Sequence, residues 1–132
     1  GYPFLLITQE SLDELNRRLD APIGIERFRP NLVVSGAGRP HAEDDWKTIR
    51  VGVVGFEIVK PCARCQIPTI DPETATMGKE PSRTLATYRR MNGKIYFGQN
   101  LIHDALGTLA VGDVVEVQTG FTPSTQNPQI TQ

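Results

Sequence analysis

Short apolar runs that end in turn-forming residues recur along the whole chain, and this spacing strongly limits the folds it can adopt. The clearest runs cover residues 4–7, 31–35, 46–51, 53–59, 95–98 and 114–117. Glycine, proline and asparagine separate them, and Asn92-Gly93 is typical of a tight hairpin turn. Strands do not alternate regularly with helices, which argues against a doubly wound parallel sheet. The pattern therefore predicts a mainly β fold, a β-barrel with two or three short α-helices.

Two segments have the features of short helices. Thr8 offers an N-cap to the first of them. Three leucines then recur at helical spacing and form one apolar stripe: Leu12, Leu15 and Leu19. The second helix is expected to begin near Pro81, with Leu85 and Tyr88 on its buried face.

The domain organisation follows from length and composition. The 132 residues, of which 39% are hydrophobic, suit one domain with one core. We expect the barrel to span residues 1–118. Residues 119–132, rich in Pro, Thr and Gln without periodicity, are expected to be a disordered tail or linker. Pro61 is expected to end the strand before the cysteines, and residues 67–79 to form a long loop.

Charge and hydropathy argue against two classes of partner. The formal net charge of −1 provides no global field that would attract nucleic acid or an anionic membrane. No apolar run approaches the roughly 20 residues of a membrane-spanning helix. The first residues lack a signal-peptide pattern, and two cysteines three residues apart are a poor disulfide framework. We therefore expect a cytoplasmic protein.

The strongest chemical feature is the Cys-x-x-Cys motif of Cys62 and Cys65. A thioredoxin-like redox pair requires a helix directly after the motif, and Gln66-Ile67-Pro68 does not begin a convincing one. A structural zinc site requires four ligands, and only two cysteines are present. Two interpretations remain at this level: one functional thiolate with a neighbouring thiol, or two inert core cysteines.

The residues around the motif favour a functional thiolate. Lys60 and Arg64 flank the cysteines, and positive charge stabilises a thiolate over a thiol. Soft metals prefer thiolate ligands. Solvation of an ordinary loop would account for either charge taken alone.

Two further motifs could contact a ligand. In Arg29-Pro30-Asn31, the guanidinium suits a phosphate and the amide offers both a donor and an acceptor. In Gly98-Gln99-Asn100, the glycine suggests backbone close to a ligand, and the amides could bind the edge of a heterocycle. Ordinary turns would explain each motif equally well. The acidic run 43–45 is expected to be solvated, with no metal.

Several fragments, in this order, resemble the MOSC domain, the C-terminal domain of molybdenum cofactor sulfurase. They are Phe28-Arg29-Pro30-Asn31-Leu32-Val33-Val34-Ser35-Gly36, Glu43-Asp44-Asp45-Trp46, Lys60-Pro61-Cys62-Ala63-Arg64-Cys65, Thr69, Asp71-Pro72, Glu80-Pro81, Phe97-Gly98-Gln99-Asn100 and Val111-Gly112-Asp113. The resemblance covers most of the chain. Each fragment alone is weak, but their ordered combination is specific. It is strongest to the bacterial YcbX-type proteins and the mitochondrial amidoxime-reducing component.

This resemblance implies a cofactor, molybdenum-molybdopterin, and a reaction, the reduction of N-hydroxylated compounds such as hydroxylaminopurines and amidoximes. By analogy, Cys65 is the catalytic residue and the molybdenum ligand, and Cys62 is its neighbour. The implied cofactor-binding residues are Arg29, Asn31, Arg64, Gln99 and Asn100. The metal would cycle between Mo(VI) and Mo(IV), with electrons from a ferredoxin-like or flavoprotein donor. Pyridoxal phosphate binding is a further property that the resemblance implies.

The chain also departs from these relatives. Their N-terminal β-barrel partner domain and the iron–sulfur domain of the YcbX type are expected to be missing from it. This leaves open whether the chain alone binds cofactor or is active. Two alternatives therefore stand beside the oxidoreductase domain. One is a sulfur-carrier module with a persulfide on a cysteine, and the other is a non-catalytic β-barrel binding domain.

Overall fold

The computed structural model describes residues 4–64, 80–104, 107–119 and 128–131. The strands are β1 (Phe4–Thr8), β2 (Leu32–Ser35), β3 (Trp46–Val51), β4 (Val54–Ala63), β5 (Arg90–Met91), β6 (Lys94–His103), β7 (Val115–Thr119) and β8 (Gln129–Ile130). The α-helices are α1 (Gln9–Arg18) and α2 (Ser82–Tyr88), and short 3-10 helices cover Ile25–Phe28 (η1) and Ala42–Asp45 (η2). The predicted mainly β fold is confirmed.

The sheet closes nearly into a barrel. Its strand order is β7-β3-β4-β6-β1-β2-β8, with β5 added as a short hairpin on β6. The pairing is antiparallel throughout except for β1 and β2. The two outermost strands then meet, because Val114 bridges to Gln129 and the Ile130 N–H donates to the Asp113 carbonyl at 2.9 Å. A barrel closed in this way leaves few free strand edges.

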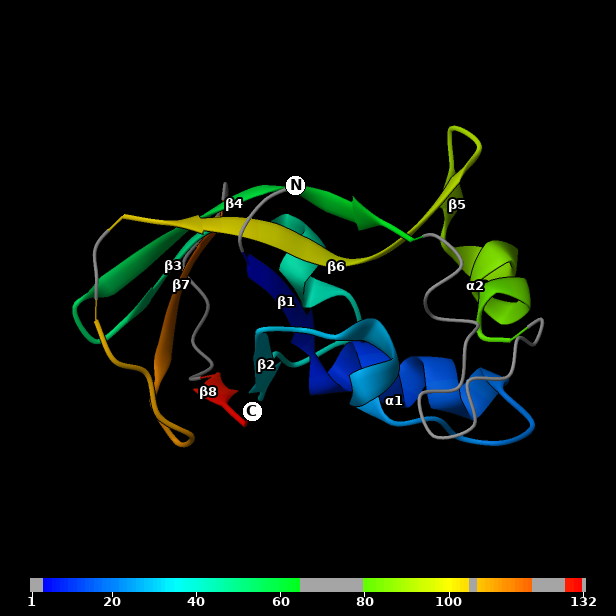
Figure 1. Cartoon of the computed structure of the whole chain (residues 1–132), viewed down its shortest axis with the longest axis horizontal. Coiled ribbons are helices and arrows are strands. Elements are labelled where there is room, and N and C mark those ends of the chain that lie inside the picture. The colour runs from blue at the N-terminus through cyan, green and yellow to red at the C-terminus, as the bar shows by residue number, and fades with distance from the viewer. Residues whose placement is uncertain (1–3, 65–79, 105–106, 120–127, 132) are drawn as a thin grey trace.

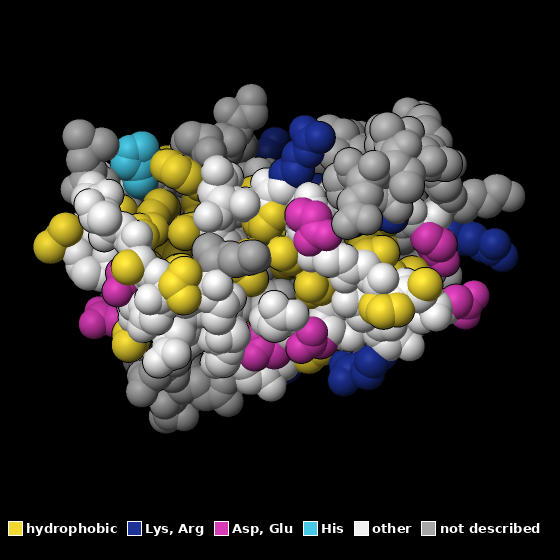
Figure 2. All heavy atoms as spheres, turned by 60° about the horizontal axis from the view of Figure 1, so that its bottom comes forward, with side chains coloured by type: hydrophobic (Ala, Val, Ile, Leu, Met, Phe, Trp, Pro, Cys, Tyr) yellow, Lys and Arg dark blue, Asp and Glu magenta, His cyan; other side chains and the backbone are white. Residues whose placement is uncertain are grey.

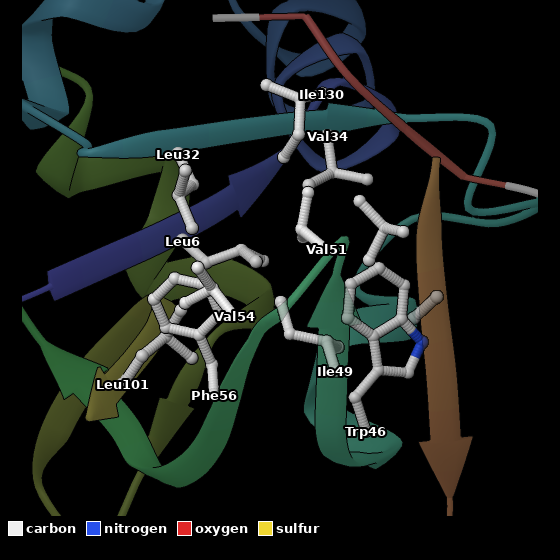
Figure 3. Packing of buried hydrophobic residues seen from close by; sticks show 12 residues of the cluster. Leu6, Leu32, Val34, Trp46, Ile49, Val51, Val54, Phe56, Leu101 and Ile130 are labelled. Atoms are coloured by element: carbon white, nitrogen blue, oxygen red, sulfur yellow. The ribbon is translucent and has the colours of Figure 1, made fainter. Parts of the chain in front are cut away.

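Two apolar clusters lie on opposite faces of β1, because neighbouring side chains of a strand point to opposite sides. Leu6 belongs to the cluster inside the barrel, which Figure 3 shows with Trp46, Phe56 and Ile130 among its members. Ile7 belongs to the outer cluster. There it packs against the leucine stripe of the first helix, against Leu85 of α2 and against two aromatic rings. The buried members of the outer cluster are Ile7, Leu12, Leu15, Leu19, Phe28, Leu85 and Phe97.

The helices gather at one end of the molecule. Figure 1 shows β4 and β6 running from the barrel toward α2, while α1 lies below them. The predicted cap of α1 is confirmed, since the Thr8 side chain accepts a hydrogen bond from the Ser11 N–H. On the face in Figure 2, acidic and basic side chains are interspersed rather than gathered by sign.

The end of β4 and the C-terminal segment differ from expectation. β4 does not end at Pro61; it continues to Ala63, with register irregularities on either side of Pro61 that accommodate a residue lacking an N–H. The expected disordered tail lies partly outside the described residues, but its end forms β8. There Ile130 is buried, and the Thr131 N–H donates to the Val33 carbonyl at 2.7 Å.

Candidate functional site

A pocket of about 460 Å³ lies against the C-terminal half of β4 and the facing part of β6. Its lining includes Cys62 and Lys60 from β4, and Lys94, Tyr96 and Asn100 from β6. Lys60 and Asn100 are register partners across the two strands. Among the described residues that line the pocket, two are lysines and none is acidic. The pocket therefore favours an anionic ligand.

A larger groove of about 540 Å³ lies on the barrel along β3, β4, β6 and β7, and Cys62 is not among its lining residues. It carries charges of both signs, with Lys47 and Arg50 beside Glu57, Asp104 and Glu116. Such a mixture selects no particular ligand charge. We therefore take the smaller pocket, which contains the cysteine strand, as the candidate site.

Asn31 is tied to this region through β1. Its Oδ1 accepts the Leu5 N–H at 2.8 Å, and its own N–H donates to the Leu5 carbonyl at 2.9 Å. Leu5 is in turn the register partner of Asn100. The predicted pair Asn31 and Asn100 thus lies on two sides of one β1 residue. Because the Asn31 oxygen is used within the protein, its amide NH₂ is the group that could donate to a ligand.

Arg29 follows η1 in the left-handed backbone region, with a φ of 53°. This region is uncommon for a residue other than glycine, so the surrounding structure must hold the turn in place. The side chain of Arg29 is exposed, which is compatible with the predicted phosphate contact.

Arg64 contacts both the cysteine strand β4 and the residue that precedes the Arg29 turn. Its Nη2 donates to the Phe28 carbonyl at 3.1 Å, and its Nη1 donates to the Cys62 Sγ at 3.1 Å. Its guanidinium carbon lies 5.2 Å from the centroid of the Phe28 ring. The Nε is buried without a hydrogen-bond partner. Two of its three nitrogens therefore bond to this protein, and the Nε–H has no hydrogen-bond partner.

Gln99 lies on the other face of β6 from the pocket. It is 2% exposed, and its Nε2 donates to Asp44 Oδ1 at 2.7 Å. The glycine before it also serves packing: a Cβ on Gly98 would lie 3.1 Å from the Leu6 carbonyl and 2.9 Å from Ile7 Cγ1. The close backbone approach expected at Gly98 is thus to β1. The predicted contact of Gln99 with a cofactor stays a prediction.

Cys65, the predicted metal ligand, lies outside the described residues, as does Asp71-Pro72. The described chain reaches Arg64, whose backbone N–H donates to the Ile95 carbonyl at 2.7 Å. Within the described ranges, no three His, Cys, Asp or Glu side chains gather into a metal-binding group. In the same ranges, no helix is long and apolar enough to cross a membrane.

Comparison with known proteins identifies the family. The model of the MOSC domain matches residues 1–116. The chain belongs to the MOSC domain family. The predicted resemblance is confirmed.

The known proteins similar to this MOSC domain include two kinds. The chain is 45% identical over 113 residues to the molybdenum cofactor sulfurase of Arabidopsis thaliana. This match covers 76% of the chain and 14% of that protein. The chain is 40% identical over 122 residues to the human mitochondrial amidoxime-reducing component 1, covering 86% of the chain and 36% of that protein. The chain thus spans well under half of the length of either relative.

A buried carboxylate of this MOSC domain was not expected from its sequence. Glu43 of η2 has no exposed surface, whereas the acidic run 43–45 was expected to be solvated. Its Oε2 accepts the Thr8 N–H at 3.1 Å, and its Oε1 accepts the Thr8 hydroxyl at 3.0 Å. The Ser11 hydroxyl donates to the same carboxylate at 2.9 Å. Burial raises the pKa of Glu43, and these hydrogen bonds oppose the shift.

Asp44, the next residue of η2, connects the MOSC core to α2. Besides accepting from Gln99, it forms an ion pair with Arg89 at 2.9 Å. Arg89 also donates from Nε to the Tyr96 carbonyl at 2.9 Å, and Tyr96 lines the pocket. η2 therefore supports β6 on the face opposite the pocket. The only sequence signal for this role was the acidic run directly before Trp46.

His41 and Tyr88 form a second buried polar group near η2. Their ring centroids are 5.9 Å apart, and both imidazole nitrogens and the phenol oxygen are buried without partners. Burial lowers the pKa of His41 to about 4, with repulsion from Arg89 as the next cause. Burial likewise raises the pKa of Tyr88 to about 12.

Proposed function

We propose that this chain is the molybdenum-cofactor-binding domain of an oxidoreductase that reduces N-hydroxylated compounds. The observation that carries the proposal is that Cys62 and Asn100 line one basic pocket, while Arg64, next to Cys65 in the sequence, donates hydrogen bonds to Cys62 and to the Phe28 carbonyl. Similarity to an amidoxime-reducing component and to a molybdenum cofactor sulfurase supports a molybdenum-related role.

The residues present fit an anionic cofactor such as molybdopterin. The buried Nε of Arg64 is a donor without a partner, and an unpaired buried donor is costly unless a ligand or water satisfies it. Lys60 and Lys94 give the pocket positive charge, and no acidic residue is among its described lining. These are the features that a phosphate-bearing group requires.

In the proposed mechanism, Cys65 supplies a thiolate to the metal, because molybdenum binds soft sulfur ligands well. Arg29 and Asn31 bind and orient the pterin phosphate and ring. Asn100 lies where a polar group could orient the N–OH substrate in the pocket. The bound cofactor supplies the two-electron chemistry that removes oxygen from nitrogen. The electrons come from a ferredoxin-like or flavoprotein donor.

Metal analysis tests this proposal. The longest natural form of the protein, expressed with molybdate, should contain molybdenum, and Cys65→Ala should remove nearly all of it. The matched variant Cys62→Ala should retain most of it, because Cys62 is proposed as a neighbour and not a ligand. Purified wild-type protein without molybdenum, or equal metal content in both variants, would contradict the proposal.

A sulfur-carrier module is the second candidate, favoured by the 45% identity to a cofactor sulfurase. In that case a cysteine would carry a persulfide. Incubation with a cysteine desulfurase and free cysteine should then increase the mass of the metal-free protein by about 32 Da, one sulfur atom, as measured by mass spectrometry. Pyridoxal phosphate binding and a cytoplasmic location stay predictions, and one group of relatives is named mitochondrial.

A further inference from the structure

Arg64 lies between Cys62 and Cys65 in the sequence, and two of its three guanidinium nitrogens bond to groups of this protein. Its Nη2 reaches the Phe28 carbonyl, 36 residues earlier in the chain, at 3.1 Å. Its Nη1 reaches Cys62 Sγ at 3.1 Å. Hydrogen bonds from a charged donor are worth roughly twice those between neutral groups. A planar guanidinium can hold two acceptors at a defined angle, which a lysine cannot do.

The two acceptors belong to the two halves of the proposed cofactor site. Phe28 directly precedes the Arg29 turn, whose left-handed backbone must be held by its surroundings. Cys62 belongs to the end of β4, and the Arg64 N–H fixes that end to β6 through the Ile95 carbonyl at 2.7 Å. The Phe28 ring also stacks on the ring of Phe97 in β6, with their centroids 4.4 Å apart.

We infer that Arg64 is a positioning residue that joins the Arg29–Asn31 turn to the cysteine strand and so holds the cofactor-binding residues at a fixed separation. This inference rests on the proposed function for what the site binds. Cys62 then has a role of its own: its sulfur is the acceptor that orients the guanidinium. Arg64 and Cys62 therefore act together.

The first test uses metal-free protein and needs no activity. In Arg64→Ala, amide hydrogen exchange in residues 28–32 should accelerate about tenfold, because a charge-assisted tether of the turn is lost. Arg50→Ala is the matched control, since Arg50 is an exposed arginine of β3 that lines the larger groove and not the pocket of Cys62. It loses the same charge and should leave exchange in residues 28–32 unchanged.

The second test measures the molybdenum-to-protein ratio of the same variants in the longest natural form of the protein. Arg64→Ala should lower it at least about fivefold while circular dichroism shows a folded protein, and Arg64→Lys should not restore it. Cys62→Ser keeps an acceptor for Nη1 and should stay near the wild-type ratio. Cys62→Ala, which loses only that acceptor and keeps the Phe28 contact, should show a small decrease.

Unchanged exchange in Arg64→Ala would overturn the inference. If molybdenum were lost in that case, Arg64 would be a direct ligand of the cofactor. Faster exchange with an unchanged molybdenum ratio would also overturn it, since the turn would then not matter for binding. Wild-type protein without molybdenum would instead refute the proposed function, and the exchange experiment would still decide whether Arg64 holds the turn.

Discussion

At the scale of single residues, Glu43 is the group on which the N-terminus of α1 depends. Replacing it with alanine leaves the buried Thr8 N–H and two hydroxyl groups without their acceptor. Each unsatisfied buried polar group costs about 1–3 kcal/mol, so Glu43→Ala should lower the free energy of unfolding by about 3–5 kcal/mol. Urea denaturation followed by circular dichroism measures this loss.

Glu43→Gln is the informative partner variant. The amide keeps one acceptor oxygen for the Thr8 N–H, and its NH₂ can donate to the Thr8 or Ser11 hydroxyl, so we expect a cost of only about 1 kcal/mol. Asp45→Ala is the control. Asp45 is half-exposed and pairs only with exposed Arg39 among the ion pairs of the described chain, so its loss should cost under about 0.5 kcal/mol. A Glu43→Ala protein as stable as Asp45→Ala would contradict this role.

At the scale of elements, β8 closes the barrel although it has only two residues. Ile130 is 3% exposed and pairs with Val34 of β2 inside the inner cluster. Ile130→Ala should therefore cost about 2–4 kcal/mol, through lost burial and the cavity that remains. Thermal denaturation of the two variants measures this loss. Gln129→Ala, at the neighbouring exposed position, should be nearly neutral in that experiment. Similar stabilities of the two variants would show that β8 does not contribute to the core.

The contrast between β8 and the earlier elements shows what sequence can predict here. Asn92-Gly93 and the Thr8 cap are local signals, and both appear in the structure with the expected geometry. β8 forms because β2 and residues 113–114 accept it, almost one hundred residues away in the case of β2. Periodicity within two residues cannot encode that pairing.

The same distinction holds for the candidate site. Family motifs predicted Arg29, Asn31 and Asn100, and the structure connects Asn31 and Asn100 through Leu5. The partners of Glu43 lie 32 and 35 residues away in α1 and β1, so its burial depends on tertiary packing. A charged run in a turn-rich segment carries no sign of such partners. Its solvation was therefore the natural but wrong expectation for Glu43.

At the scale of the whole molecule, His41 makes stability depend on pH. Its pKa falls from 6.5 to about 4 on folding, so the unfolded chain takes up a proton at a higher pH than the folded one. The free energy of unfolding therefore keeps its full value above pH 6.5, where His41 is neutral in both states, and decreases as the pH falls toward 4. Since His41 is only partly buried, we expect the loss to be about 1–2 kcal/mol, less than the full shift would imply.

Urea midpoints at pH 7, 6 and 5 (approximate set points that bracket the titration) measure this dependence. His41→Asn removes the titrating group, and asparagine tolerates the left-handed backbone at this position, where φ is 59°. The fall in stability should largely disappear in that variant and persist in the control His103→Asn, at an exposed position of β6. Glu43 acts in the opposite direction, because its raised pKa favours the folded state as the pH falls. Glu43→Gln should therefore steepen the fall, and a His41→Asn protein that keeps the wild-type slope would show that His41 is not its source.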